Sequence, residues 1–342
     1  MIIVLRAHTP ADRIEAICQR VVDHGYEPRL IQGVERTVIA AVGDEIDNRS
    51  LEDLESLPEV EQVMPVQKRF KLASREYHPE NTVAMIGDQP IGGGAFMHIC
   101  GPCSVESEEQ MHRVAQDLLA AGVKVLRGGA YKPRTSPYDF QGMGLDGLAL
   151  LAEMKRTYGM AIVTEVLAVN HVEAVAEVAD MLQIGARNCQ NYNLLEVAGG
   201  TGRPVLLKRG MATKIDEWIL AAEYLLVHGA PQVILCERGI RTFESATRFT
   251  LDIAAVAIAR RETHLPIVVD PSHPAGHAEL VLPLARAAIA AGADGLMIET
   301  HPCPSEALSD AAQQLPSADM AGIIAELQPL VDLCEPWRKG AS

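Results

Sequence analysis

The sequence predicts a (β/α)8 TIM barrel preceded by a small ferredoxin-like α+β domain. Residues 1–70 show apolar strands and amphipathic helices in the order β-α-β-β-α-β, which is the order of the ferredoxin-like split motif. From residue 95 to residue 342, short apolar runs alternate regularly with helical patterns, as in an α/β barrel. At 342 residues, of which 48% are apolar, the chain is long enough to bury one large core and one small one.

The amino-terminal unit contains four apolar runs that we expect to form strands. They are Ile2–Leu5, Pro28–Ile31, Thr37–Val42 and Val60–Val66. Residues Ala11–Val22 separate the first two runs and place Ile14, Ile17 and Val21 on one face, which predicts an amphipathic helix. A weaker helix is expected over Ser50–Ser56. The unit therefore has every element of the split motif.

Residues 71–94 are polar and rich in turn-forming residues, so we expect a linker that ends in a short strand pair around Val83–Ile91. The barrel then occupies residues 95–342, and eight apolar runs within it are strand candidates: Phe96–Cys100, Val123–Leu126, Ala161–Thr164, Met181–Ile184, Pro204–Leu207, Gln232–Leu235, Pro266–Val269 and Gly295–Ile298. Each run is continuous rather than alternating, which is typical of parallel strands buried on both faces. The alternative is an open doubly wound sheet, but no phosphate-binding G-x-G-x-x-G motif follows the first strand.

The charge and composition of the chain exclude several classes of protein. A formal net charge of −15 argues against a nucleic acid as the main partner. No apolar stretch is long enough to span a bilayer, and the amino terminus lacks the basic region and cleavage site of a signal peptide. The seven cysteines are odd in number and show no framework spacing, which fits reduced thiols. We therefore expect a cytoplasmic protein without a membrane partner.

Charged side chains follow nearly every predicted barrel strand. In a barrel the carboxyl ends of the strands converge on one mouth, where active sites lie. Glu165 follows the third strand, and six cations stand at or just beyond the exits of the other strands: Arg127, Lys132, Arg134, Arg187, Lys208 and Arg238. Arginine and lysine in such positions bind phosphate or carboxylate groups. Six cations are enough for more than one phosphate, or for a phosphate and a carboxylate.

A second group of exit residues has the chemistry of a metal site. Cys103, His273 and Glu299 follow three of the strands, and Asp310 lies in the loop after the eighth. Taken singly, each has a structural explanation, such as a buried thiol or a surface acid. Together they offer sulfur, nitrogen and oxygen ligands, a mixture that suits Mn²⁺, Fe²⁺ or Zn²⁺.

The sequence Cys100-Gly-Pro-Cys103 also matches the thioredoxin redox signature. That signature requires a thiol at a helix amino terminus in a much smaller fold. No tryptophan precedes the pair here, and the surrounding pattern is that of a barrel. Redox chemistry is therefore the weaker interpretation of these two cysteines.

The strand-exit motifs together resemble those of 3-deoxy-D-arabino-heptulosonate 7-phosphate (DAHP) synthase. The motifs that carry the resemblance are Gly101–Glu106, Arg127–Ser136, Gly185–Asn188, Leu207–Gly210, Glu237–Gly239, Asp270–His273 and Glu299–Pro302. The similarity is greatest to the type Iβ form with an amino-terminal ferredoxin-like regulatory domain. It extends from residue 1 to about residue 330.

The resemblance implies a transferase, 3-deoxy-7-phosphoheptulonate synthase, that condenses phosphoenolpyruvate with erythrose 4-phosphate. This is the first step of the shikimate pathway of aromatic amino acid biosynthesis. The resemblance also implies one divalent metal ion, held by Cys103, His273, Glu299 and Asp310. The residues implied to surround phosphoenolpyruvate are Arg127, Lys132, Glu165, Ala186, Arg187, Lys208 and Arg238, and those implied to take erythrose 4-phosphate are Pro133, Arg134 and Thr135.

Three residues are expected to take part in catalysis. Lys132 is placed where it can bridge both substrates and donate a proton to the new alkoxide. Glu165 can orient the water that attacks the second carbon of phosphoenolpyruvate. His273 is the third, as a ligand of the metal that polarises the aldehyde.

Two alternative functions compete with this interpretation. One is 3-deoxy-manno-octulosonate 8-phosphate synthase, which uses arabinose 5-phosphate. That family has Lys-Ala-Asn-Arg where this chain has Lys132-Pro-Arg-Thr135. The other is a non-catalytic sensor of sugar phosphates or amino acids, against which stands the presence of every expected catalytic residue.

Regulation is expected at the amino-terminal domain. The resemblance implies allosteric feedback inhibition by an aromatic amino acid bound between neighbouring subunits of a homotetramer. Arg29 and Ile31 stand where histidine and serine contacts to the effector are expected, so tyrosine is not assigned as that effector. Without metal, Cys103 is further expected to be open to reversible oxidation with Cys100 or Cys334.

Overall fold

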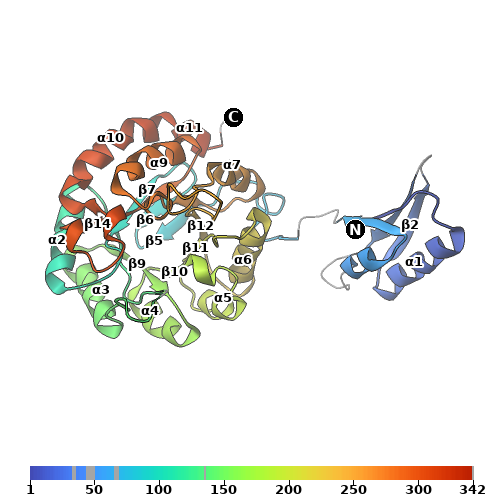
Figure 1. The fold of residues 1–342 in the computed structure, drawn as a ribbon, viewed down its shortest axis with the longest axis horizontal. Helices are drawn as coiled ribbons and strands as arrows, with labels where there is room; N and C mark the ends of the chain where they lie inside the picture. The colour runs from blue at the N-terminus through green and yellow to red at the C-terminus, as the bar shows by residue number, and fades with distance from the viewer. Residues whose placement is uncertain (33–35, 44–50, 65–68, 135, 341–342) are drawn as a thin grey trace. The chain divides into compact units, whose positions relative to one another are not determined.

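A computed structural model describes residues 1–32, 36–43, 51–64, 69–134 and 136–340 (Figure 1). The chain divides into two compact units, Met1–Arg69 and Phe70–Ser342. Each unit has its own hydrophobic core.

The amino-terminal unit is a four-stranded antiparallel sheet in the order β2-β3-β1-β4. Its elements are β1 (Ile2–Leu5), α1 (Ala11–Asp23), β2 (Glu27–Gln32), β3 (Thr37–Val42), the 3-10 helix η1 (Glu52–Ser56) and β4 (Val60–Met64). Ile3, Leu5 and Ile39 of the sheet are fully buried against Ile17 and Val21 of α1. The ferredoxin-like order is confirmed, with a single 3-10 turn as the second helix. The outer ends of two predicted elements, Ser50 and Val66, lie outside the described residues.

The larger unit is a closed parallel barrel. Its strands are β7 (Met97–Gly101), β8 (Val125–Arg127), β9 (Ala161–Val166), β10 (Met181–Ile184), β11 (Val205–Lys208), β12 (Val233–Glu237), β13 (Ile267–Val269) and β14 (Gly295–His301). Each strand pairs in parallel with the next, and β14 pairs with both β13 and β7. This pairing closes the sheet, so the barrel is confirmed and the open doubly wound alternative is wrong. A short strand, β15 (Leu315–Pro316), extends the pairing of β14.

Helices surround the barrel and bury its outer face (Figure 1). They are α2 (Glu108–Ala120), α3 (Leu145–Tyr158), α4 (Val172–Val178), α5 (Tyr192–Gly199), α6 (Ile215–Val227), α7 (Ile253–Glu262), α8 (Ser272–Ala275), α9 (Ala278–Ala290), α10 (Met320–Leu333) and α11 (Glu335–Arg338), with short 3-10 helices η2 (Val169–His171), η3 (Ala186–Asn188), η4 (Pro304–Glu306), η5 (Ala311–Gln313) and η6 (Ser317–Asp319). Among the described residues, no helix has both the length and the apolar character needed to cross a membrane.

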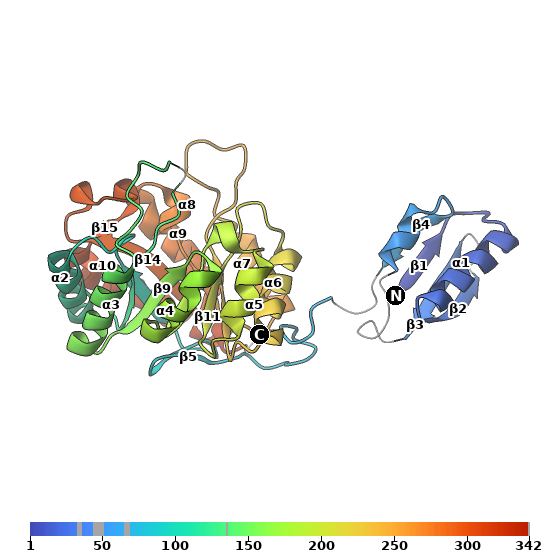
Figure 2. The same ribbon diagram turned by 90° about the horizontal axis from the view of Figure 1, so that it is seen from below.

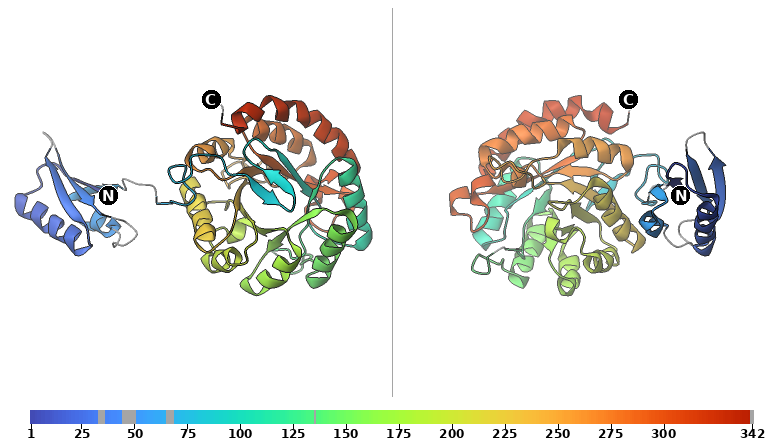
Figure 3. Two further views of the ribbon diagram at one scale, coloured as in Figure 1. Left: turned by 180° about the vertical axis from the view of Figure 1, so that it is seen from behind. Right: turned by 45° about the vertical axis from the view of Figure 1, so that its right-hand side comes forward.

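One end of the barrel is closed by a hairpin. Its strands are β5 (Ala84–Ile86) and β6 (Gln89–Ile91), and they lie across the end of the barrel where the parallel strands begin (Figures 2 and 3). Ile86 and Ile91 are fully buried in one cluster with apolar residues of the barrel interior, such as Met181 and Leu206. Apolar side chains therefore fill this end of the barrel interior.

The segment that leads into the hairpin is fixed to helix α6 by a carboxylate. Oε1 of Glu223 accepts hydrogen bonds from the backbone N–H groups of Lys71 and Leu72 at 2.9 and 2.8 Å, and Oε2 accepts one from Ala73 at 2.8 Å. A charged acceptor with three backbone donors makes stronger hydrogen bonds than a neutral one. Glu223 is therefore expected to hold the start of this segment against the barrel.

Replacing Glu223 tests this anchor. We expect Glu223→Ala to lower the free energy of unfolding by roughly 1.5–3 kcal/mol, because it removes hydrogen bonds to a charged group. The same change should speed proteolytic cleavage near residue 72. Urea denaturation and limited proteolysis are the measurements, with Asp216→Asn, an exposed acid on the same helix, as the control. Equal stability of the two variants would show that the anchor contributes nothing.

Candidate active site

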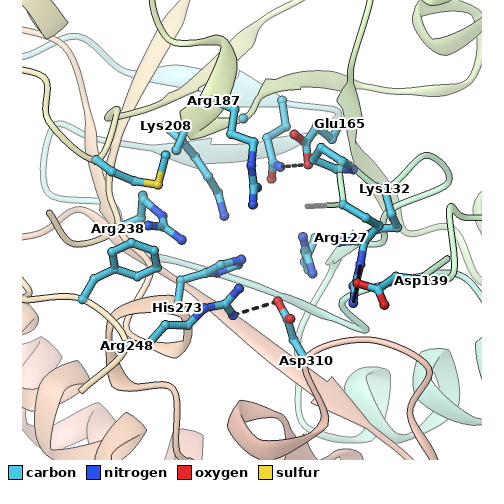
Figure 4. Close-up of a pocket in the computed structure, with 17 residues that line it drawn as sticks. Arg127, Lys132, Asp139, Glu165, Arg187, Lys208, Arg238, Arg248, His273 and Asp310 are labelled. Atoms are coloured by element: carbon cyan, nitrogen blue, oxygen red, sulfur yellow. Dashed lines mark hydrogen bonds and ion pairs between the residues drawn. The ribbon is translucent and has the colours of Figure 1, made fainter. Parts of the chain in front are cut away.

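The carboxyl ends of the barrel strands open into one polar pocket (Figure 4). Its volume is about 230 Å³, below the roughly 300 Å³ at which typical ligand pockets begin, which suits small metabolites. The predicted site residues that line it are Arg127, Lys132, Pro133, Arg134, Glu165, Ala186, Arg187, Lys208, Arg238, His273 and Asp310. The two others that the structure describes, Cys103 and Glu299, are fully buried beside them. Thr135 lies outside the described residues.

Cationic side chains point into the pocket from several strands. Figure 4 shows Arg187, Lys208 and Arg238 directed at a common space that Arg127 also faces. Nη1 of Arg238 and Nε of Arg127 are buried and have no hydrogen-bond partner among the described residues. Burial lowers the pKa of Arg238, since desolvation opposes its charge. Buried, incompletely paired guanidinium groups fit an anion with several oxygen atoms, such as a phosphate.

A buried carboxylate connects two of the pocket residues. Asp270 is fully buried; its Oδ2 lies 2.6 Å from Nζ of Lys208 and 2.7 Å from Nδ1 of His273. Burial alone would raise the pKa of Asp270, but its interactions with His273 and Lys208 outweigh burial and hold this pKa well below its usual range. With Nδ1 facing Asp270, the other ring nitrogen of His273 lies 3.7 Å from Oε1 of Glu299.

The donors predicted for a metal lie close together. Ligand atoms of Cys103, Glu299 and Asp310 are all within 4.8 Å of one another, and His273 is adjacent through Glu299. Cys103 follows β7, Glu299 belongs to β14, and Asp310 immediately precedes η5. Since the set provides one thiol, one imidazole and two carboxylates, its chemistry fits a borderline divalent cation.

Cations of the pocket contact this donor group directly. Nη1 of Arg127 donates to Oε1 of Glu299 at 2.8 Å and to the carbonyl oxygen of Pro102, also at 2.8 Å. Nζ of Lys132 lies 2.9 Å from the carbonyl oxygen of Cys103 and 3.1 Å from its Sγ. Burial, together with the charge of Glu299, raises the pKa of Cys103 to about 11. The cationic side chains of the pocket are therefore in direct contact with the group of sulfur and oxygen ligands.

Glu165 occupies space that only glycine leaves free. Its Oε2 accepts a hydrogen bond from Nε2 of Gln183 at 3.3 Å. A Cβ atom at Gly185, at the end of the neighbouring strand β10, would lie 1.9 Å from Oε1 of Glu165. Gly185 thus permits the carboxylate of Glu165 to reach the pocket.

A second group of charged residues, centred on Arg209, lies next to the cations of the pocket and is paired within itself. Nη1 of Arg209 donates to Oε2 of Glu237 at 2.9 Å and to Oδ2 of Asp252 at 2.8 Å, and its Nε donates to the carbonyl oxygen of Thr213 at 2.9 Å. Glu237 also accepts from the backbone of Gly239 at 2.7 Å. This network fixes the residues that adjoin Lys208 and Arg238 in the chain.

Sequence reasoning missed several residues of the site. Arg209 directly follows Lys208, and Asp270 lies three residues before His273, so their charge close to a predicted ligand was the available signal. Arg248 and Phe249 line the pocket from the long loop between β12 and α7, and no strand-exit rule points to them. Gln313 is buried next to Glu299, and its amide gave no signal in the sequence.

The two cysteines of the thioredoxin-like signature do not share an environment. Cys103 adjoins the pocket, whereas Cys100 packs in the hydrophobic layer between the barrel and its helices. All seven cysteines are free thiols. This arrangement gives no support to a redox pair.

Comparisons with known proteins agree along the whole chain. Residues 74–332 match the DAHP synthetase I family, and residues 1–68 match the DAHP synthase ferredoxin-like domain. A phospho-2-dehydro-3-deoxyheptonate aldolase of Thermotoga maritima is 51% identical over 333 residues, which cover 97% of this chain and 98% of the relative. The crystal structure of the Thermotoga maritima DAHP synthase superimposes with a TM-score of 0.92 at 50% identity, covering 98% of each chain. A 2-dehydro-3-deoxyphosphooctonate aldolase of Acidithiobacillus ferrooxidans is 33% identical over 68% of this chain and 88% of its own.

The pairing behind the pocket predicts a coupled loss of stability. We expect Arg209→Met to lower the free energy of unfolding by about 3–5 kcal/mol, because it leaves the buried Glu237 without its counter-charge. Adding Glu237→Gln should recover part of the loss. Urea denaturation of the single and double variants measures the coupling, with Arg241→Met, an exposed arginine, as the control. Strictly additive effects would contradict the pairing.

Proposed function

The chain belongs to the DAHP synthetase I family, and we propose how its pocket condenses phosphoenolpyruvate with D-erythrose 4-phosphate to give DAHP and phosphate. This reaction is the first step of the shikimate pathway. The Lys132-Pro-Arg-Thr135 sequence supports erythrose 4-phosphate rather than arabinose 5-phosphate as the sugar phosphate. The greater identity to the heptonate than to the octonate aldolase points the same way. A non-catalytic sensor would have no need of the full set of charged residues.

The observation that carries the proposal is that buried cations contact residues of the predicted metal-ligand set, which includes the sulfur of Cys103. Arg127 contacts Glu299, and Lys132 contacts Cys103, within one small pocket. Phosphoenolpyruvate has a phosphate and a carboxylate, and we propose that Arg127, Lys132, Arg187, Lys208 and Arg238 bind these two groups, with Ala186 beside them. Unpaired donors on Arg127 and Arg238 support this assignment.

We propose that Cys103, His273, Glu299 and Asp310 hold one divalent metal ion, with Mn²⁺, Fe²⁺ and Zn²⁺ as candidates. Their mixed donors and mutual distances support the assignment. When bound, the ion supplies Lewis-acid polarisation of the aldehyde oxygen of erythrose 4-phosphate. We propose that Asp270, whose Oδ2 lies 2.7 Å from Nδ1 of His273, orients the ring.

The sugar phosphate is proposed to lie against the loop after β8. Pro133 and Arg134 line the pocket, and Arg134 is held by Asp139 at 3.3 Å. Thr135 completes the proposed set. In this position the aldehyde carbon can face the third carbon of phosphoenolpyruvate, so that a carbon–carbon bond forms between them.

Lys132 and Glu165 are proposed to handle protons and water. Burial would lower the pKa of Lys132, but the neighbouring acids Cys103, Glu299 and Glu165 raise it, so the lysine is protonated and can donate to the alkoxide formed from the aldehyde. Attack by phosphoenolpyruvate leaves cationic character at its second carbon. Glu165 is proposed to orient the water that adds there before phosphate departs.

We propose that the amino-terminal unit is regulatory. It matches the ferredoxin-like domain found in DAHP synthases, and the proposed effector is an aromatic amino acid acting within a homotetramer. Arg29 and Ile31 both lie on β2, two residues apart and therefore on one face of the sheet. We propose that residues 1–70 form the regulatory domain, 71–94 the linker with its short strand pair, and 95–342 the catalytic barrel. The seven free thiols support a cytoplasmic location.

A paired substrate assay tests the activity. The enzyme should consume phosphoenolpyruvate with erythrose 4-phosphate and prefer it to arabinose 5-phosphate by on the order of 100-fold in kcat/KM. Chelator should abolish turnover, and Mn²⁺ should restore it. Preference for arabinose 5-phosphate would favour the octulosonate alternative, and no consumption with either sugar would favour a sensor.

Lys132→Met tests the proton donor. We expect kcat to fall by about 10²- to 10⁴-fold, the usual contribution of general acid catalysis. Steady-state kinetics at saturating substrate are the measurement. Lys124→Met, which changes an exposed lysine just before β8, should leave kcat unchanged. Turnover of Lys132→Met near that of the unmodified enzyme would remove the lysine from the mechanism.

A further inference from the structure

Gln313 connects two carboxylates that belong to the proposed metal site. It lies at the end of η5 and is 2% exposed. Its Nε2 donates to Oε2 of Glu299 at 2.6 Å and lies 3.5 Å from Oδ2 of Asp310. One amide group thus contacts the carboxylates of both residues.

Arg248 holds the other end of the same amide. Its Nη1 donates to Oε1 of Gln313 at 2.8 Å and lies 3.0 Å from Oδ2 of Asp310 (Figure 4 shows the second contact). An arginine can only donate and an ionised carboxylate can only accept. A side chain that stands between them must both accept and donate, and a glutamine amide does so without adding charge.

The two carboxylates need such support for different reasons. Asp310 has φ 50° and ψ 35°, in the left-handed region, where a residue other than glycine is strained by roughly 1–2 kcal/mol. Oε1 of Glu299 already accepts a hydrogen bond from Arg127, so Gln313 fixes the remaining oxygen, Oε2.

We propose that Gln313, held in place by Arg248, is a positioning residue that orients Glu299 and Asp310 toward a shared divalent cation. This inference rests on the proposed metal site. Residues that hydrogen-bond to metal ligands typically contribute 10- to 100-fold to metal affinity. Gln313 does not line the substrate pocket, so its effect should appear in metal binding before substrate binding.

The test measures binding of Mn²⁺ to the full-length protein in the absence of substrate. The electron paramagnetic resonance signal of free Mn²⁺ reports how much of the ion is unbound. Gln313→Leu nearly keeps the volume of the side chain and removes its hydrogen bonds to Glu299, Asp310 and Arg248. We expect its Kd for Mn²⁺ to rise 10- to 100-fold. At saturating Mn²⁺ its KM for phosphoenolpyruvate should stay within about twofold of the unmodified enzyme, since uniform substrate binding is untouched. Gln116→Leu, at an exposed position on α2, is the control.

A second variant provides an independent test that does not depend on the folding of Gln313→Leu. Arg248 is 38% exposed, and Arg248→Lys keeps the charge but shortens the side chain, which withdraws the nitrogen from Gln313 and Asp310. It should weaken Mn²⁺ binding several-fold on its own and add little in the Gln313→Leu background. An unchanged Kd in Gln313→Leu would overturn the inference, as would a raised KM for phosphoenolpyruvate at saturating Mn²⁺. Failure of the unmodified protein to bind Mn²⁺ would overturn the proposed metal site and this inference with it.

Discussion

The compensation of buried charge at the mouth of the barrel is the constraint on which the rest of the site depends. Arg127 of β8 pairs with Glu299 of β14, and Lys208 of β11 pairs with Asp270 after β13. Each pair joins residues distant in sequence, and loss of one partner from such a pair typically costs several kcal/mol. Because the closed barrel brings these exits together, the fold supplies the counter-charges that its functional residues need. The guanidinium N–H groups without a partner among the described residues, above all on Arg238, are those available to a ligand.

One end of the barrel contributes mainly to stability, and the other contributes mainly to function. The end closed by β5 and β6 is filled by apolar side chains, and the opposite end carries the charge. This separation allows costly features, such as the left-handed backbone at Asp310, to persist because the surrounding structure holds them in place.

The predictable part of this protein is the part that periodicity and strand exits determine. Continuous apolar runs located all the barrel strands, although β14 continues to His301 and so contains Glu299. The cations and the four metal-type donors were found because exits of parallel strands converge. Arg248 and Gln313 could not be found in this way, since they come from irregular segments whose path depends on tertiary packing. The domain boundaries and the individual residue roles stay predictions.

The charge balance also links the two halves of the pocket. Arg127 has one nitrogen on Glu299 and another without a partner, so the same guanidinium faces both the donor group and the proposed phosphate position. Arg127 competes with a cation for Glu299. An anion that draws Arg127 toward itself weakens the contact between Arg127 and Glu299 and so favours the cation. A cation at Glu299 in turn releases Arg127 for the anion. Any such coupling between the affinities is reciprocal by thermodynamic necessity, so a metal ion at the proposed site and phosphoenolpyruvate in the proposed pocket would strengthen each other's binding to the same extent.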